Sequence, residues 1–109
     1  MKKSLLVSLL MICTAHAAET KLSGAEMQTI LSDKILYGKD AEQIFQKAGA
    51  TFYSSGGGQS QGNWKIDGDK YCSQWPPNQA WACYDMTQDG NKITFVSKDG
   101  QRTEMSITK

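Results

Sequence analysis

The sequence predicts one mainly β (α+β) domain, in which a short N-terminal helix precedes an antiparallel β-meander with one disulfide. Asp-Gly pairs at 67–68, 89–90 and 99–100 separate short alternating segments, and such pairs are the strongest local signal for β-hairpins. Ser23 followed by Glu26 forms a capping box, which marks the start of a helix. The length of 109 residues suits one domain and excludes a TIM barrel or a two-domain dinucleotide enzyme.

The first seventeen residues have the features of a secretory signal peptide. Met1–Lys3 is basic, residues 5–14 are mostly apolar, and Ala15-His16-Ala17 is a small-residue cleavage signal. We therefore expect residues 1–17 to be cleaved and residues 18–109 to form a single β-meander domain, in the periplasm of a Gram-negative bacterium or secreted. An uncleaved anchor is the less favoured alternative, because the apolar run is shorter than the roughly 20 residues that span a bilayer.

Cleavage would remove His16, the one histidine of the chain, and leave 92 residues. The loss of Lys2 and Lys3 would leave ten basic against eleven acidic residues, a net charge of −1. Without histidine there is no Ser-His-Asp triad, no Cys-His pair and no imidazole for a metal. The aspartates that could form a carboxylate site adjoin turns, where Asp bonds the local backbone. We expect no enzyme, no cofactor, no metal, no nucleic-acid partner, no membrane span and a monomer.

Two cysteines, Cys72 and Cys83, remain after cleavage in a compartment that favours disulfides. Their spacing is not C-x-x-C, which disfavours a redox pair or a metal-thiolate site. A two-residue turn at Pro77-Asn78 places the two cysteines opposite each other and pairs Tyr71 with Tyr84. The cysteines are therefore predicted to form a cross-strand disulfide.

The first half of the mature chain carries several separate signals. Residues 18–21 are expected to be a frayed polar start, followed by a helix from Ser23 to about Ser32 and a strand at 35–37. Residues 40–54 fit either a helix from Asp40 to Ala48 or a hairpin that turns at Ala48-Gly49. The hairpin is favoured because it pairs Phe45 with Phe52 and Ile44 with Tyr53. Residues 54–61, with their glycine run, are predicted to be a flexible polar connector.

From Gly62 onward, alternation predicts five strands at about 62–66, 69–75, 80–88, 91–97 and 101–107. Two-residue turns at Asp67-Gly68, Pro77-Asn78 and Asp89-Gly90 place four aromatic side chains in one row on one face: Trp64, Tyr71, Tyr84 and Phe95. We expect this row to lie in the core, covered in part by Met27, Ile30 and Leu31 of the helix. The strands would form a small lipocalin-like half-barrel, and closure into a full barrel stays open.

The segment from Trp75 to Trp81 is the strongest candidate for a binding site. Its two prolines and the disulfide at its base restrict the loop, and a rigid loop with aromatic side chains loses little entropy on binding. The candidate binding residues are Trp75, Pro76, Pro77, Asn78, Gln79 and Trp81. The alternative is that the two tryptophans only close the end of the sheet.

Three short motifs support a resemblance: Gly62-x-Trp64, then the run from Tyr71-Cys72 to Trp75-Pro76, then Trp81-Ala82-Cys83-Tyr84. In this order they resemble a family of small secreted proteobacterial proteins with the pattern G-x-W, Y-C-x-x-W-P and W-x-C-Y. The resemblance covers about residues 22–107. It implies a signal peptide and a small antiparallel, barrel-like domain with a strand pair near Phe45 and Phe52, and it assigns no catalytic or binding residue.

The sequence favours a non-catalytic periplasmic or secreted binding or interaction module, with a protein partner at the stapled loop. One alternative is an inhibitor of a secreted hydrolase, such as a lysozyme or a protease, by analogy at the level of fold. Another is a carrier of a small apolar ligand inside a barrel lined by Trp64, Tyr71, Tyr84 and Phe95. The carrier ranks lower because a barrel made from so short a chain is expected to be filled by its own side chains.

Overall fold

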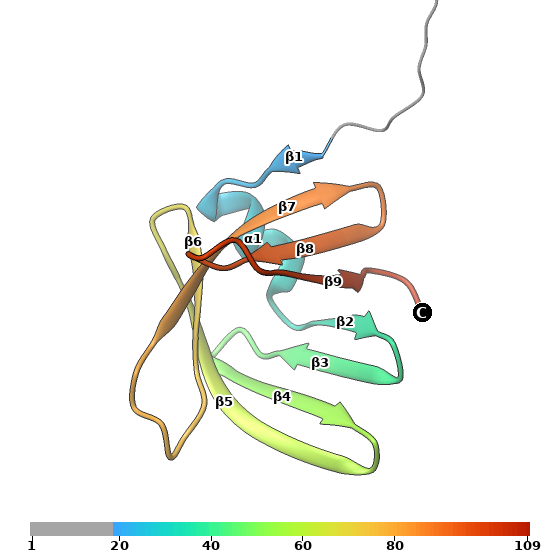
Figure 1. Ribbon diagram of the computed structural model, residues 1–109, viewed down its shortest axis with the longest axis vertical. Helices are drawn as coiled ribbons and strands as arrows, with labels where there is room; N and C mark the ends of the chain where they lie inside the picture. The colour runs from blue at the N-terminus through green and yellow to red at the C-terminus, as the bar shows by residue number, and fades with distance from the viewer. Residues whose placement is uncertain (1–18) are drawn as a thin grey trace, which may run out of the picture.

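The computed structural model describes residues 19–109, which form an eight-stranded antiparallel barrel with one additional strand and one short helix (Figure 1). The elements in chain order are β1 (Thr20–Lys21), α1 (Gly24–Leu31), β2 (Lys34–Gly38), β3 (Ala41–Phe45), β4 (Ala50–Ser55), β5 (Gly58–Asp67), β6 (Lys70–Gln74), β7 (Ala82–Asp89), β8 (Lys92–Val96) and β9 (Arg102–Ser106). The predicted fold class is confirmed, while the expectations for residues 1–17 lie outside the described residues.

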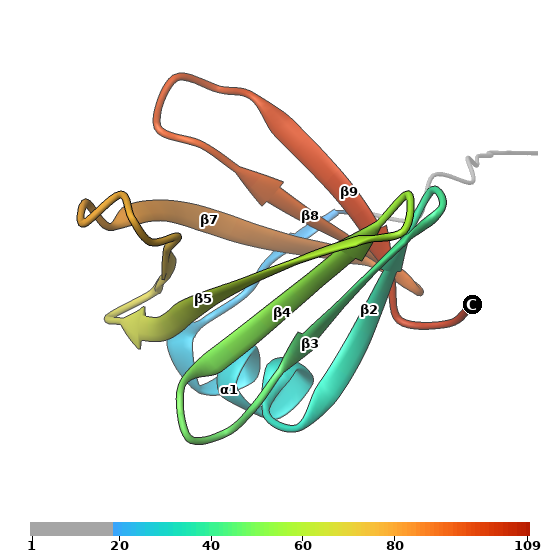
Figure 2. The same cartoon turned by 90° about the horizontal axis from the view of Figure 1, so that it is seen from below.

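The barrel strands follow one another in chain order, as in a meander. β2 to β9 each pair with the next strand, and β9 closes onto β2 through Tyr37 and Ser106. Figure 2 shows the two walls, β2–β5 and β7–β9, meeting beside the C-terminus. The question of closure that the sequence left open is therefore answered by a full barrel.

The expectation of a frayed start at residues 18–21 was wrong for Thr20 and Lys21, which form strand β1. β7 has eight residues, and β6 pairs only with its first three, Ala82–Tyr84. β1 takes the remaining edge, with Lys21 opposite Thr87 and the Leu22 amide donating to the Met86 carbonyl at 2.8 Å. An unpaired run of backbone donors and acceptors is costly, and the N-terminal segment supplies their partners.

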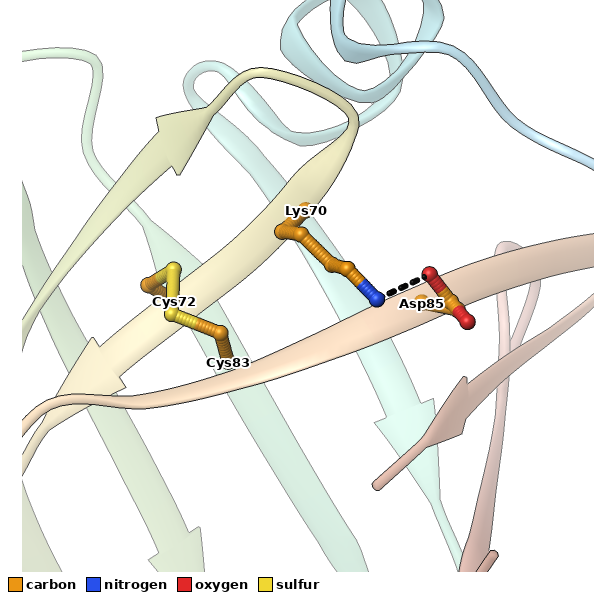
Figure 3. The surroundings of a disulfide bond; sticks show 4 residues. All are labelled: Lys70, Cys72, Cys83 and Asp85. Carbon is orange, nitrogen blue, oxygen red and sulfur yellow. Dashed lines mark hydrogen bonds and ion pairs between the residues drawn. A yellow bond between two sulfur atoms is a disulfide. The ribbon is translucent and has the colours of Figure 1, made fainter. Parts of the chain in front are cut away.

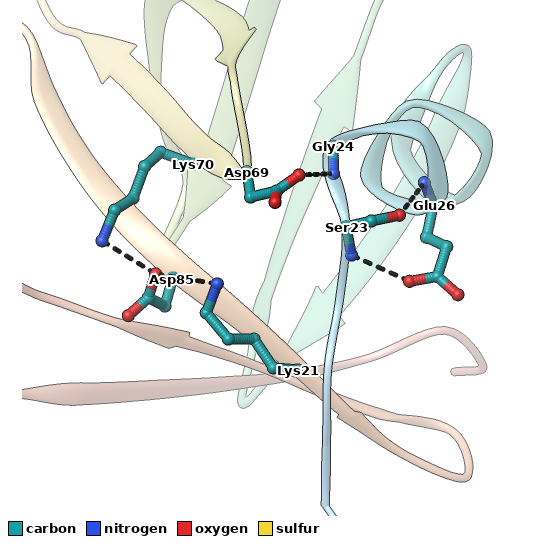
Figure 4. A network of polar contacts seen from close by, with 7 residues as sticks. All are labelled: Lys21, Ser23, Gly24, Glu26, Asp69, Lys70 and Asp85. Atoms are coloured by element: carbon teal, nitrogen blue, oxygen red, sulfur yellow. Dashed lines mark hydrogen bonds and ion pairs between the residues drawn. The ribbon is translucent and has the colours of Figure 1, made fainter.

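α1 begins with the predicted capping box. The Glu26 amide donates to Ser23 Oγ at 3.2 Å, and the Ser23 amide donates to Glu26 Oε1 at 2.8 Å (Figure 4). The Gly24 amide donates to Asp69 Oδ1 of the β5–β6 turn at 2.7 Å, which ties the start of the helix to the barrel. Met27 and Leu31 are fully buried, so the helix closes one part of the barrel against β2, β5 and β6.

The close approach of α1 to the β5–β6 turn predicts that Gly24→Ala destabilises the domain. A Cβ at residue 24 would lie 2.1 Å from the Gly68 carbonyl oxygen, and backbone cannot move aside cheaply. We expect the free energy of unfolding to fall by about 1–3 kcal/mol, the usual cost of overpacking. Urea unfolding measures the change, with the exposed Gln28→Ala on the same helix as control. An equal effect of both variants would contradict the close contact.

Residues 40–54 form strands β3 and β4, as favoured, but the predicted register was wrong by one residue. The loop has three residues, 47–49, with Gly49 at φ 117°, and the Gln46 amide donates to the Ala50 carbonyl at 2.8 Å. Phe45 therefore pairs with Thr51, and Ile44 pairs with Phe52. A shift of one residue reverses the faces, so Phe45 is buried inside while Phe52 stays partly exposed outside.

The flexible connector predicted at residues 54–61 was also wrong. β4 and β5 run through this segment and turn at Gly56-Gly57, whose φ values are 58° and 82°. Two successive residues with positive φ make a type I′ turn, which matches the twist of a hairpin. The glycine run is therefore a tight turn, and it extends β5 to ten residues.

The cysteine register is confirmed, with Cys72 opposite Cys83 and Tyr71 opposite Tyr84. The turns predicted at Asp67-Gly68 and Asp89-Gly90 sit one residue later than predicted, because Gly68 and Gly90 occupy the first turn position with φ 61°. Glycine at that position is typical of type II′ turns. Each pairing therefore slips by two residues, and Trp64 faces Ser73 while Phe95 faces Met86. A two-residue slip keeps the face, so all four aromatic side chains of the predicted row still point inward.

Candidate functional site

The predicted binding loop joins β6 to β7, and its two tryptophans lie on opposite faces of the barrel wall. Trp75 is half-buried and borders the barrel interior. Trp81 is 39% exposed, on the outer face, where its ring lies 4.3 Å from Lys65 Nζ. The structure therefore does not bring the two tryptophans together as one site, and the loop residues between them are exposed.

The loop is held in shape by its own hydrogen bonds. Gln74 Nε2 donates to the Gln79 carbonyl at 2.8 Å, and the Ala80 amide donates to Asn78 Oδ1 at 2.9 Å. The Asn78 amide donates to the Trp75 carbonyl at 3.1 Å. These bonds tie both arms of the loop together above the disulfide.

The disulfide Cys72–Cys83 joins β6 to β7 with Cα atoms 4.0 Å apart (Figure 3). Lys70 lies two residues before Cys72, and Asp85 lies two residues after Cys83. Lys70 Nζ donates to Asp85 Oδ1 at 2.8 Å, and Lys21 Nζ lies 3.6 Å from the same oxygen. The hydrogen bond from Lys70 lowers the pKa of Asp85. The carboxylate is partly exposed, so this ion pair contributes little to stability. It nevertheless gives Asp85 a structural partner within the barrel wall.

Two aspartates in turns also form hydrogen bonds within the scaffold. Asp69 accepts from the Gly24 amide, and Asp99 accepts from the Ser97 hydroxyl. Within residues 19–109, no group of three or more His, Cys, Asp or Glu side chains is arranged to hold a metal ion. The same residues contain no helix long and apolar enough to cross a membrane.

A cavity of about 370 Å³, partly open to solvent, lies among inward-facing side chains of the barrel strands. No residue of α1 lines it. Its walls come from β2, β3, β4, β6, β7, β8 and β9, from the β2–β3 turn and from the β6–β7 loop. The lining residues are Gly38, Lys39, Gln43, Tyr53, Tyr71, Ser73, Trp75, Tyr84, Phe95, Thr103, Glu104 and Met105. Most are aromatic or carry a neutral hydrogen-bonding group, which is the usual lining of a small-molecule site.

Tyr71 lies between this cavity and the hydrophobic core. Its ring centroid lies 5.9 Å from that of Phe45 and 6.4 Å from that of Trp64, on the core side. On the cavity side, the centroids of Phe95 and Tyr84 lie at 5.0 and 6.1 Å. Burial raises the pKa of the Tyr71 hydroxyl far above its usual value, and the polar side chains of Ser73 and Gln43 beside it oppose this rise. The floor of the cavity is therefore a neutral phenol.

The raised pKa of Tyr71 predicts that stability falls with alkaline pH. The unfolded chain releases the phenol proton above about pH 10, while the folded protein retains it, so stability present below that pH is lost as pH rises. We expect Tyr71→Phe to flatten this decline between pH 9 and 10.5, measured as the pH slope of the urea unfolding free energy. The slope at pH 6–8 is the internal control, and a variant slope equal to that of the parent would contradict the prediction.

The Trp75 ring packs directly against the backbone of Gly62 on β5, where no side chain intervenes. A Cβ at residue 62 would lie 2.6 Å from the Gln74 carbonyl oxygen and 2.7 Å from the Trp75 ring. Beyond Trp75 the surface continues into a groove of about 340 Å³, lined by Tyr53, Ser60, Gln61, Trp75 and Pro76. Tyr53 and Trp75 line both spaces and so form the rim between them.

Gly62→Ala is therefore expected to push Trp75 out of the rim. In a Trp81→Phe background, we expect a red-shifted emission and stronger acrylamide quenching, because the indole gains solvent contact. Gly58→Ala on the same strand is the control, since its Cβ would meet only the Ser55 carbonyl oxygen at an ordinary 3.7 Å. An unchanged spectrum for Gly62→Ala would show that Trp75 does not depend on this glycine.

A larger groove, of about 1010 Å³, lies between three hairpin turns and the C-terminal segment. Four of its seven charged lining residues are paired with one another, Lys92 with Glu104 at 3.7 Å and Lys109 with Glu42 at 3.9 Å. It lacks the aromatic lining of the interior cavity, with Tyr37 alone at its edge. We regard it as a surface depression rather than the site.

The sequence identified only part of the cavity. Tyr71, Tyr84 and Phe95 of the predicted apolar-ligand set line it, but Trp64 belongs to the core and donates its Nε1 proton to the Gln46 carbonyl at 2.7 Å. Gln43, Tyr53, Ser73 and Thr103 were missed. Two-residue alternation along each strand was the available signal, because these residues share the inward face with the core residues of their strands.

No protein-family model matches the chain, and neither a curated protein nor a solved structure matches it.

Proposed function

We propose that this protein is a non-catalytic binding module that holds a small molecule in the cavity of its barrel. The observation that carries the proposal is the 370 Å³ cavity beside the buried core, with aromatic walls and convergent neutral polar groups. Sites of this kind occur in the mouths of β-barrels. The sequence ranked a ligand carrier below the interaction module and the inhibitor, because a barrel made from so short a chain was expected to be filled by its own side chains. A cavity beyond Tyr71 supports the carrier instead.

A secreted or periplasmic location accompanies the proposal. The basic, apolar and A-x-A segments at residues 1–17 support it, and so does the disulfide between Cys72 and Cys83. Membership of the small secreted family with the G-x-W, Y-C-x-x-W-P and W-x-C-Y motifs is part of the same proposal. The absence of histidine after cleavage supports binding without catalysis.

The proposal is tested by ¹⁵N–¹H NMR on oxidised residues 18–109 with neutral small molecules, from 1-naphthol to glucose. We expect shifts confined to cavity residues such as Ser73, Trp75 and Tyr84. Thr103→Trp, which fills the cavity from β9, should abolish them, whereas the exposed loop variant Gln101→Trp should not. If no compound shifts these residues, or if Thr103→Trp leaves the shifts intact, the proposal fails.

A second candidate is an inhibitor of a secreted hydrolase that acts through the loop from Pro76 to Trp81. The exposed indole of Trp81 and the internal hydrogen bonds of the loop favour it, since a preorganised aromatic loop binds with little entropy loss. Inhibition assays against a panel of lysozymes and proteases test it. Inhibition that is lost in Asn78→Ala/Gln79→Ala would support this function, and no inhibition by the parent would exclude it for that panel.

A further inference from the structure

We infer that the ligand of the barrel cavity is a neutral sugar ring. The inference rests on the proposed function and concerns the chemistry that the cavity walls select. Three features of the walls carry it: an absence of buried charge among the described lining residues, a set of buried polar groups, and aromatic faces between them.

The cavity favours a neutral ligand. Its charged lining residues are Lys39 and Glu104, both exposed, and Glu104 is paired with Lys92. The floor is the phenol of Tyr71, which stays protonated because it is buried. A charged group held against this floor would lose hydration and would find no buried counter-charge there, because Lys39 and Glu104 are exposed.

The cavity also favours a ligand with hydroxyl groups over an apolar one. Gln43 and Ser73 are buried, at 8% and 4% exposure, and they flank the Tyr71 hydroxyl. Tyr84 and Thr103 bring further hydroxyls to the same space. Gln43 Nε2 already donates to Thr51 Oγ1 at 3.0 Å, so the capacity that remains lies in its carbonyl oxygen and in the hydroxyl groups. An apolar molecule would shield that capacity from water without meeting it, whereas hydroxyls on a ligand would meet it.

The shape of the lining agrees with a sugar ring. A pyranose presents C–H bonds on its faces and hydroxyls around its edge, so it fits between flat aromatic surfaces with polar groups beside them. Phe95, Tyr84, Tyr53 and Trp75 provide such surfaces. The volume of 370 Å³ equals the space of about twelve waters at roughly 30 Å³ each, which accommodates one ring with its substituents. A longer glycan would continue past the rim formed by Tyr53 and Trp75.

Isothermal titration and saturation-transfer NMR on oxidised residues 18–109 test the inference with four probes. Glucose and N-acetylglucosamine are neutral sugars, glucuronate is a charged one, and 1-naphthol is an aromatic molecule with a single hydroxyl. We expect the neutral sugars to bind through their ring protons and glucuronate to bind at least about tenfold more weakly. Tyr84→Phe, which keeps the ring and removes one hydroxyl, should weaken sugar binding about three- to tenfold. Tyr37→Phe, outside the cavity, should leave it unchanged.

The outcomes separate this inference from the proposed function. If 1-naphthol binds in the cavity and the neutral sugars do not, the sugar assignment is overturned and the binding module stands. Equal binding of glucuronate and glucose overturns the requirement for a neutral ligand, and so overturns the inference. If none of the four probes perturbs the cavity residues and the wider set of neutral molecules also fails, both are overturned.

Discussion

Phe45→Ala is expected to lower the free energy of unfolding by about 3–5 kcal/mol, the usual cost of removing a buried aromatic side chain. Phe45 is fully buried, and its ring meets Trp64 and Tyr71 edge to face, with centroids 5.9 Å from each. A domain of this size has only about 5–15 kcal/mol of stability in total, so much of it would be lost. Urea unfolding followed by far-UV circular dichroism measures the change.

Phe52→Ala is the matched control, because it makes the same substitution on the neighbouring strand. Phe52 lies on the outer face and is only partly buried, so we expect a loss well below that of Phe45→Ala. The comparison also tests the register of the β3–β4 hairpin, since a two-residue turn would place both rings on one face. Equal losses for the two variants would contradict the three-residue loop and the inward orientation of Phe45.

Loss of the disulfide is expected to lower the free energy of unfolding by roughly 3 kcal/mol. The bond closes a loop with a sequence separation of 11, and the estimate follows from the chain entropy that such a closure removes from the unfolded state. A small domain depends on such a constraint because its core is modest. The Cys72→Ala/Cys83→Ala variant should unfold at a lower urea concentration than the oxidised parent.

Reduction provides the control for this prediction. A thiol reductant should lower the unfolding midpoint of the parent toward that of the double variant, and it should leave the double variant unchanged. If the reductant shifts both proteins equally, its effect does not pass through this bond. If the parent unfolds at the same midpoint in both redox states, the disulfide does not stabilise the domain.

The two predictions concern different parts of the proposed site. Phe45 supports Tyr71 from the core side, and Tyr71 forms the floor of the cavity. Cys72 of the disulfide lies three residues before Trp75, which forms part of the rim. Ligand-binding measurements on both variants would therefore separate damage to the floor from damage to the rim.

Local interactions could be predicted from the sequence because each needs only residues that are close along the chain. The capping box joins Ser23 to Glu26, three positions apart, and its bonds are present as predicted. The pairing of Cys72 with Cys83 depends on one hairpin, and it is also present. The inward face of Trp64, Tyr71, Tyr84 and Phe95 survived two turn errors because the side-chain period of a strand is two residues.

Turn placement depended on which residue takes a positive φ, and short-range patterns left this open. Gly68 and Gly90 occupy the first turn position, and Gly49 ends a loop of three residues. The last case shifted the register by one and exchanged Phe52 for Thr51 as the inward partner of Phe45. Alternation alone could not resolve it, because both registers paired apolar side chains.

By itself, the sequence determined the fold class, the helix start, the disulfide and the inward face of the aromatic row. Only the tertiary structure decided that the barrel closes between β2 and β9, that β1 fills the edge of β7, and that a cavity remains beyond Tyr71. The physical reason is that these features depend on strand lengths and on contacts between residues far apart in the chain. The volume left inside a barrel is the difference between the space that its walls enclose and the side chains that enter it. That difference is set by all eight strands together, and no single segment encodes it.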